Sequence, residues 1–151
     1  MDGYAVRFAD TATASGSTPI RLQVIEDIPA GTVPQRKVST GQASRIMTGA
    51  PVPEGADTVI RVEDTRSEDD WVEILEPEDG VGENIRGQGD DMKSGEVLLR
   101  AGDLVGPGEI GVLATAQHAN LTVTRRPTIA ILSSGDELVE VGEPLGPGQI
   151  I

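Results

Sequence analysis

Apolar and polar residues alternate in the first half of the chain, and this pattern predicts β-strands. Across residues 20–24, Ile and Leu and Val side chains alternate with Arg and Gln, a period of two that is typical of a strand with one buried face. Apolar runs at 58–62 and 71–75 predict two further strands, and residues 97–99 a short one. Residues 1–17 indicate a strand fragment followed by a loop, because they end in small polar side chains.

The pattern changes at Pro107, which suits the first turn of a helix. Apolar and amide side chains then recur on one helical face, at Ile110, Leu113, Ala114 and Gln117. Residues 121–124 indicate another strand. Residues 128–132 form a continuous apolar run, which favours a strand buried on both faces of a parallel α/β sheet. Because no partner strand follows, this run is interpreted as the opening of an α/β domain.

Composition makes the predicted sheets irregular. The chain has 19 glycines and 10 prolines in 151 residues, and they interrupt nearly every strand. Aromatic residues make up only 2%, so the core must consist of small aliphatic side chains. The sequence therefore predicts a mainly β fold, an irregular coiled or bifurcated β-sheet module with one short helix, joined to the first strand of a truncated α/β domain.

Charge and residue inventory exclude several classes of function. The net charge of −13 disfavours binding to nucleic acid or to an anionic membrane surface. The chain has no cysteine and one histidine, His118, so it cannot form a thiolate or multi-histidine metal site. It has no signal pattern and no run long enough to span a membrane. A soluble cytoplasmic protein is the expectation.

Two segments near the N-terminus carry candidate chemistry. Asp2 precedes a glycine, a pair that is most often a turn, although its carboxylate could also face a ligand. Residues 45–53 form a rigid loop with a glycine and two prolines, in which Thr48 could present a hydroxyl and a backbone N–H. On residue types alone, a structural turn that sets strand register is the preferred interpretation of this loop.

A glycine-rich segment at 82–91 combines one cation with two acids. Glycine lets the backbone approach a ligand closely, and Arg86 could hold an oxyanion through two parallel donors. Asp90 and Asp91 could hold Mg²⁺ through their oxygens, although adjacent acids on such a loop are mostly solvated. Neighbouring side chains of an extended segment point to opposite faces, so at most one of the two is expected to enter a given site.

The segment 133–138 directly follows the apolar run at 128–132. Ligands of open α/β sheets bind beyond the carboxyl ends of strands, where Ser133, Ser134 and Gly135 could present N–H groups to a phosphate. Asp136 or Glu137 could then hold a metal or orient a substrate group. The motifs of the common nucleophilic and nucleotide-binding enzymes are absent from the chain.

Four segments, at 1–7, 41–59, 82–91 and 133–138, occur together in this order in one known family. They read MDGYAVR, GxAxRIMTGAPVPxGADTV, GxNIRxxGxD and SxGDEL, and their order and spacing resemble the molybdopterin molybdenumtransferases of the MoeA and gephyrin type. The resemblance covers essentially the whole chain. It implies molybdenum insertion from molybdate into adenylylated molybdopterin, with Mg²⁺ and release of AMP, in molybdenum cofactor biosynthesis.

The resemblance also implies an architecture and partners. Residues 1–17 would begin the β module and its linker domain, 18–105 would form an elongated β-rich domain, 106–126 a return segment with a short helix, and 127–151 the start of a MogA-like α/β domain. The family is longer at both ends and homodimeric. A MogA-type adenylyltransferase is an implied partner, and the active site is expected between the β-rich domain of one subunit and the α/β domain of the other.

The functional residues of the family fall on particular positions of this chain. Asp91 and Glu137 are expected to be catalytic and to hold Mg²⁺, whereas Asp2 and Thr48 are expected to contact the substrate. The remaining substrate-binding residues are expected to be Arg86, Ser133, Ser134 and Gly135. Ser134 stands where many members have threonine, and Asp90 where many have glutamate; both changes keep the chemistry of the side chain.

Two other functions stay open at this point. The gephyrin branch of the family also anchors membrane receptors, which suggests a non-catalytic scaffold or interaction module. A stand-alone β-rich module without a ligand is the third interpretation. The unpaired apolar run at 128–132 argues against it, since an exposed strand edge of that kind invites aggregation.

We expect this 151-residue chain alone to catalyse no turnover. The reason is that further contacts to the pterin phosphate would come from the rest of the α/β domain. The measurement is molybdate-dependent release of AMP from adenylylated molybdopterin. Release of AMP by the 151-residue chain would contradict the prediction.

Overall fold

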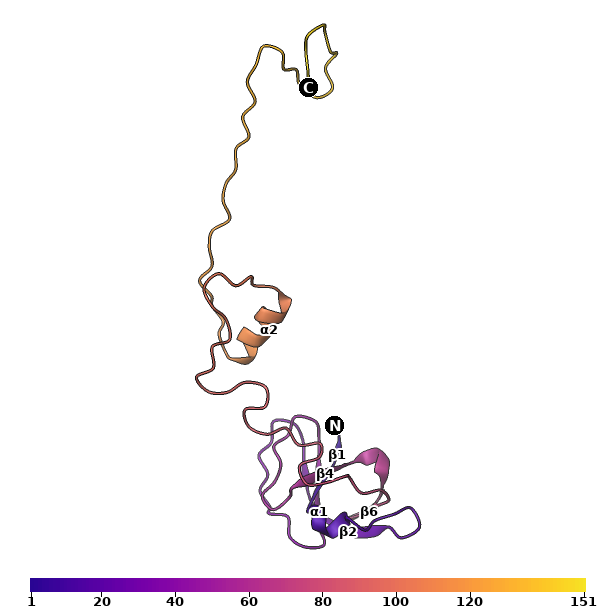
Figure 1. The fold of residues 1–151 in the computed structure, drawn as a ribbon. Helices are drawn as coiled ribbons and strands as arrows, with labels where there is room; N and C mark the ends of the chain where they lie inside the picture. The colour runs from indigo at the N-terminus through magenta and orange to yellow at the C-terminus, as the bar shows by residue number, and fades with distance from the viewer. The chain divides into compact units, whose positions relative to one another are not determined.

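The computed structural model describes all 151 residues, which divide into two compact units, Met1–Glu96 and Val97–Ile151 (Figure 1). The first unit holds the β-sheet, and the second holds the longer of the two α-helices. The fold is mainly β, as the sequence predicts. The domain boundaries expected at residues 17, 105 and 126 stay a prediction.

The first unit is built on one open six-stranded sheet with the strand order β4-β1-β3-β2-β6-β5. Its strands are β1 (Gly3–Val6), β2 (Ile20–Ile28), β3 (Gln42–Ile46), β4 (Thr58–Arg61), β5 (Thr65–Glu68) and β6 (Trp71–Ile74). A single helical turn, α1 (Phe8–Thr11), follows β1, and a 3₁₀ turn, η1 (Val62–Asp64), follows β4. In this order, strands that are far apart in the sequence lie side by side, for example β1 and β4.

Most strand pairs are antiparallel. β1 lies between β3 and β4 and pairs antiparallel with both, and β6 pairs antiparallel with β2 and with β5. The pair β2–β3 is parallel, and its register shifts between Val24 and Glu26, which marks a bulge. The predicted strands at 20–24, 58–62 and 71–75 are confirmed, the first of them longer than its alternation indicated.

Two strands were not predicted, and the reasons differ. β5 has the sequence Thr-Arg-Ser-Glu, with no apolar residue, and its side chains are mostly exposed. It is held as a strand by pairing with β6 across the turn at Asp69 and Asp70, where Asp69 has a φ of 47°. β3 mixes Gln, Ala, Ser, Arg and Ile, and only its place between β1 and β2 makes it a strand.

The core lies on both faces of the sheet. One cluster consists of Tyr4, Val6, Ala14, Leu22, Ala43, Ile60, Val72 and Ile74. The other consists of Ala5, Ile28, Ile46 and Val59. All four residues of β1 are buried, because its side chains alternate between the two clusters. Tyr4 is the only aromatic side chain in the core, so the prediction of a small-aliphatic core is confirmed.

The second unit contains the predicted helix, α2 (Pro107–Thr115), drawn in orange in Figure 1. Pro107 occupies its first turn, and the Glu109 carboxylate accepts a hydrogen bond of 2.8 Å from the Gly106 N–H, which satisfies a backbone donor at the helix start. Ile110, Leu113, Ala114 and Gln117 line one hollow with His118, Ala119 and Leu121, so the predicted face is confirmed.

The runs at 97–99, 121–124 and 128–132, predicted as strands, form no strand in the structure. A strand needs a partner for its backbone groups, and none pairs with these runs. Ile131 and Leu132 are 90% and 91% exposed, so an apolar run alone does not produce a buried strand. The expected first strand of an α/β domain is therefore not formed here.

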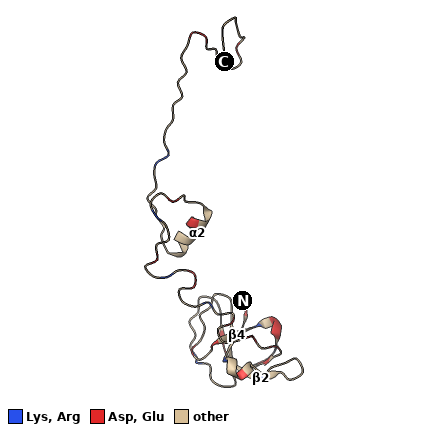
Figure 2. Ribbon diagram, in the orientation of Figure 1, with Lys and Arg blue, Asp and Glu red and all other residues tan.

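Figure 2 shows the charged residues, of which 25 are acidic and 12 basic. Several basic side chains are paired with acids: Arg21 with Glu68, Lys37 with Glu54, Arg66 with Glu73 and Arg86 with Asp91. Such exposed pairs contribute little to stability. None of the helices is both apolar and long enough for a membrane crossing.

We predict that Gly3→Ala destabilises the first unit. A Cβ at this position would lie 2.1 Å from the Ile60 carbonyl oxygen, which belongs to the adjacent strand β4 and cannot move without disturbing the sheet. The expected loss in free energy of unfolding is about 1–3 kcal/mol, the usual range for overpacking, and urea denaturation measures it. Gly16→Ala is the matched control, since a Cβ there meets nothing within 4 Å. Equal stabilities of the two variants would contradict the prediction.

Candidate functional site

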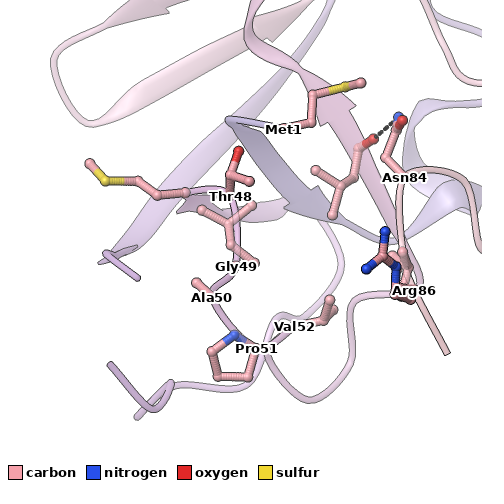
Figure 3. A pocket seen from close by; sticks show the side chains of 12 residues that line it. Met1, Thr48, Gly49, Ala50, Pro51, Val52, Asn84 and Arg86 are labelled. Carbon is pink, nitrogen blue, oxygen red and sulfur yellow. Dashed lines mark hydrogen bonds between the residues drawn. The ribbon is translucent and has the colours of Figure 1, made fainter. Parts of the chain in front are cut away.

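A cavity of about 440 Å³ opens on the first unit where three segments meet. The segments are the N-terminal residue Met1, the loop after β3, and residues 84–86 of the glycine-rich segment. In Figure 3 Thr48 and Arg86 lie on opposite sides of this cavity. The apolar part of its wall includes Val52, Val59 and Ile85. The cavity thus combines one cation, one hydroxyl and an aliphatic surface.

The loop after β3 begins with a tight turn. The Ala50 N–H donates to the Met47 carbonyl at 2.9 Å, and Gly49 has a φ of 85°, which a residue with a side chain rarely adopts. The Met47 N–H donates to the Ile28 carbonyl at 3.1 Å, so the turn is tied to the end of β2. Thr48 is therefore held at the tip of a fixed turn.

Asp2 and Thr48 form a direct contact. The Asp2 Oδ1 atom accepts hydrogen bonds from the Thr48 backbone N–H at 2.9 Å and from the Thr48 hydroxyl at 3.0 Å. These bonds, the backbone one first, lower the pKa of Asp2 below its usual value, and the charge of Arg45 acts in the same direction. Asp2 directly precedes β1, and its own carbonyl accepts from the Val62 N–H at 3.1 Å.

This contact changes the interpretation of Thr48. The sequence suggested that the Thr48 hydroxyl and N–H would be offered to a ligand, but Asp2 accepts from both. With its proton directed to Asp2, the hydroxyl oxygen presents lone pairs to other groups. In this arrangement Thr48 is a hydrogen-bond acceptor for a ligand.

The glycine-rich segment is anchored to β4. The Val59 N–H donates to the Glu83 carbonyl at 3.2 Å, and the Asn84 side-chain amide donates to the Val59 carbonyl at 2.9 Å. Beyond it, the Arg86 Nη1 atom donates to the Asp91 Oδ2 atom at 2.9 Å. These two side chains are 74% and 62% exposed, so a ligand can reach both.

The two adjacent acids have separate roles in this segment. The Asp90 Oδ2 atom accepts from the Gly87 N–H at 2.6 Å and closes a turn, whereas Asp91 pairs with Arg86. The Asp91 Oδ1 atom has no partner within the chain. No three His, Asp or Glu side chains gather as a metal site would need. Mg²⁺ usually binds through one or two carboxylates and takes its remaining ligands from water and phosphate oxygens, so a single carboxylate such as that of Asp91 is compatible with Mg²⁺ binding.

The residues Ser133, Ser134, Gly135 and Glu137 lie in the second unit and are exposed. The Leu138 N–H donates to the Gly135 carbonyl at 3.1 Å, and the Ile150 N–H donates to the Glu137 carbonyl at 2.7 Å, so the segment forms a turn held by the chain end. A hollow of about 580 Å³ is lined by residues 133–135 and others nearby. In the first unit, Thr48 and Arg86 line one cavity, Thr48 bonded to Asp2 and Arg86 paired with Asp91. The 133–137 segment belongs to the second unit.

Sequence reasoning missed Asn84. It donates to Val59 and, at 2.8 Å, to the Glu78 carboxylate, and it has a φ of 60°. The signal that could have found it is an asparagine in a glycine-rich turn, because asparagine is one of the few non-glycine residues that tolerate this backbone conformation. The apolar wall was also missed, since Val52, Val59 and Ile85 come from three separate segments.

Comparison with known proteins gives consistent matches. A family model described as the MoeA N-terminal region (domain I and II) matches residues 1–116. The molybdopterin molybdenumtransferase of Bacillus subtilis (strain 168) is 43% identical over 99% of this chain, and that of Nostoc sp. (strain PCC 7120) is 44% identical over the whole chain. The chain spans 35% and 34% of the lengths of these two relatives.

Solved structures agree with the sequence matches. The crystal structure of a molybdopterin biosynthesis MoeA protein from Pyrococcus horikoshii OT3 superposes with a TM-score of 0.82 at 39% identity, covering 98% of this chain and 38% of that one. A second MoeA structure from the same genus gives a TM-score of 0.70 at 37% identity. The chain therefore belongs to the MoeA family, and its residues 1–116 match the N-terminal region of that family.

Proposed function

We propose that this chain supplies part of the substrate site of a molybdopterin molybdenumtransferase. The reaction is insertion of molybdenum from molybdate into adenylylated molybdopterin, with release of AMP. The observation that carries the proposal is that Thr48, which is hydrogen-bonded to Asp2, and Arg86 line the same cavity. The names of the relatives, molybdopterin molybdenumtransferases, support it.

The cavity suits a ligand that is anionic at one end and planar at the other. Arg86 provides the cation on its wall, and a guanidinium recognises phosphate or another oxyanion through two parallel donors. The aliphatic side chains of Val52, Val59 and Ile85 provide a surface against which a flat pterin ring can pack. The Thr48 oxygen would accept a hydrogen bond from an N–H of the ring.

The Arg86–Asp91 pair gives the site a way to receive an anion. The pair is exposed, so the two side chains gain little from each other in water. A phosphate group that binds Arg86 would replace Asp91 and leave that carboxylate free. We therefore propose that the freed Asp91 carboxylate acts at the pyrophosphate end of the substrate.

Mg²⁺ is part of the proposal, with Asp91 and Glu137 as the carboxylates that would hold it or its waters. When bound, Mg²⁺ neutralises charge on the pyrophosphate. Ser133, Ser134 and Gly135 would offer hydroxyl and N–H donors to the phosphate. In the whole protein the two segments are proposed to meet across a homodimer, and a MogA-type adenylyltransferase would supply the adenylylated substrate.

We predict that Asp91→Asn in the full-length protein lowers the rate of AMP release by about a hundredfold, the lower end of the range for loss of a general acid or base. The assay is AMP release from adenylylated molybdopterin with molybdate and Mg²⁺. Asp79→Asn is the matched control, because Asp79 is an exposed acid of the same region that, unlike Asp91, pairs with no cation.

The outcomes of this assay separate the proposals. Equal release by parent and Asp91→Asn would keep the activity and remove Asp91 from the mechanism. Absence of release by a folded parent protein would instead favour the scaffold function. Unchanged dependence on Mg²⁺ in Asp91→Asn and in Glu137→Gln would remove the two acids as metal ligands.

We also predict that Thr48→Val raises the pKa of Asp2 while leaving it below its usual value. The substitution removes the hydroxyl donor but keeps the backbone N–H, which has the larger effect. Because the pKa is lowered by folding, the contact contributes to stability above the usual carboxylate pKa, and this contribution is lost as the pH falls through the lowered value. Carbon-13 NMR titration of the Asp2 carboxylate measures it. Thr18→Val, which removes a hydroxyl that donates no hydrogen bond, is the control, and an Asp2 pKa identical in both variants would contradict the prediction.

A further inference from the structure

The outer edge of β4 is covered by a loop instead of a strand. β4 is the last strand of the sheet, and Val59 directs its N–H and carbonyl away from β1. The Glu83 carbonyl accepts from this N–H, and the Asn84 side-chain amide donates to this carbonyl at 2.9 Å. Asn84 thus takes the place of the backbone donor that a neighbouring strand would supply.

The backbone at Asn84 adopts an unusual conformation. Its φ of 60° lies in the left-handed region, which asparagine tolerates better than most residues. The turn is closed by the Ile85 N–H, which donates to the Gly82 carbonyl at 3.1 Å, and Gly82 itself has a φ of 91°. This conformation turns the chain back so that Ile85 packs against the cluster around Val59 and Arg86 lines the cavity.

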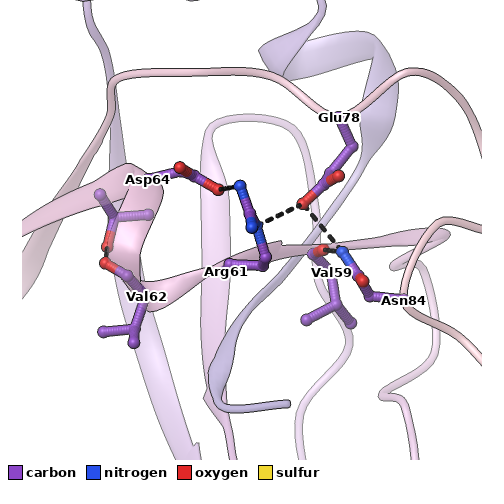
Figure 4. Close-up of polar contacts among 7 residues, drawn as sticks. Val59, Arg61, Val62, Asp64, Glu78 and Asn84 are labelled. Carbon is purple, nitrogen blue, oxygen red and sulfur yellow. Dashed lines mark hydrogen bonds and ion pairs between the residues drawn. The ribbon is translucent and has the colours of Figure 1, made fainter.

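A chain of polar contacts holds the Asn84 amide in place (Figure 4). The second donated bond of Asn84 goes to the Glu78 Oε1 atom at 2.8 Å. The same Glu78 oxygen lies 3.9 Å from the Arg61 Nε atom, and the Arg61 Nη2 atom lies 2.5 Å from the Asp64 Oδ2 atom. The side chains of Glu78 and Asp64 are only 18% and 15% exposed, so both carboxylates are largely shielded from solvent.

From these contacts we propose that Asn84 is a positioning residue for substrate binding, which acts by fixing the loop that presents Arg86 to the cavity. The inference rests on the proposed function only in naming the ligand of Arg86. Asn84 lies on the same cavity wall two residues before Arg86. Its amide is directed to Val59 and Glu78, so it influences the ligand through the backbone.

The test in the full-length protein is Asn84→Gly, which keeps the left-handed backbone accessible and removes the amide. We expect KM for adenylylated molybdopterin to rise about tenfold, the effect of losing one or two hydrogen bonds, with kcat unchanged, the signature of lost uniform binding. Asp69→Gly is the matched control, because it likewise places glycine at a left-handed residue, in the turn between β5 and β6.

A double-mutant cycle with Arg86→Gln separates positioning from a merely structural role. If Asn84 acts through Arg86, Asn84→Gly has no further effect on KM once the guanidinium is gone. An unchanged KM in Asn84→Gly, or the same tenfold rise in the Arg86→Gln background, would overturn the inference.

Hydrogen exchange tests the positioning without the reaction. In Asn84→Gly the Val59 amide is expected to lose protection by about tenfold or more, since its partner loop is released, whereas the amides of β3 keep theirs. If the parent protein shows no turnover, the proposed function fails, whereas this exchange result still supports the role of Asn84 in fixing the loop of Arg86. Retained protection of the Val59 amide, or loss of protection throughout the sheet, would overturn the inference.

A conservative exchange provides a second check. Asn84→Asp keeps the size of the side chain but places a carboxylate against Glu78 and the Val59 carbonyl, and a larger rise in KM than in Asn84→Gly is expected. Adding Glu78→Gln restores a hydrogen-bond donor between the two side chains, so KM should fall part of the way back. No recovery of KM in the double variant would contradict the contact between Asn84 and Glu78.

Discussion

The position of β1 between β3 and β4 is the constraint on which the site depends. β1 is buried on both faces and pairs with both neighbours, and Gly3 allows the Ile60 carbonyl to come close. Asp2 directly precedes this strand and Thr48 follows β3, so the register of the pair β1–β3 places the carboxylate against the threonine turn. Strand pairing therefore places Asp2 against the threonine turn, and the turns at Gly49 and Asn84 complete the cavity wall.

The fold was predictable where a single strand carries its own pattern. The alternation in β2 and the apolar runs of β4 and β6 were sufficient, and Pro107 correctly marked the start of α2. β3 and β5 have no such pattern, because their pairing partners determine them. The prediction for residues 128–132 is wrong for the opposite reason: their composition favours a strand, but no partner strand pairs with them.

The sequence predicted which segments carry the candidate site, but it did not predict the contacts between their residues. Asp2, Thr48, Arg86 and Asp91 were selected, and the structure places all four in the first unit. The sequence did not reveal that Asp2 takes both donors of Thr48, because this depends on the sheet register. Asn84 was overlooked because its importance comes from its backbone angle and from a carbonyl of β4.

The pairing of β1 also has a consequence for the order in which the chain folds. Gly3 pairs with Ile46 and with Arg61, so β1 comes before both of its partners in the chain and gains its contacts only when distant residues return to it. Contacts between residues so far apart close large loops and slow folding. Until then the apolar residues Tyr4, Ala5 and Val6 remain uncovered, and apolar segments exposed in this way during folding are prone to aggregation.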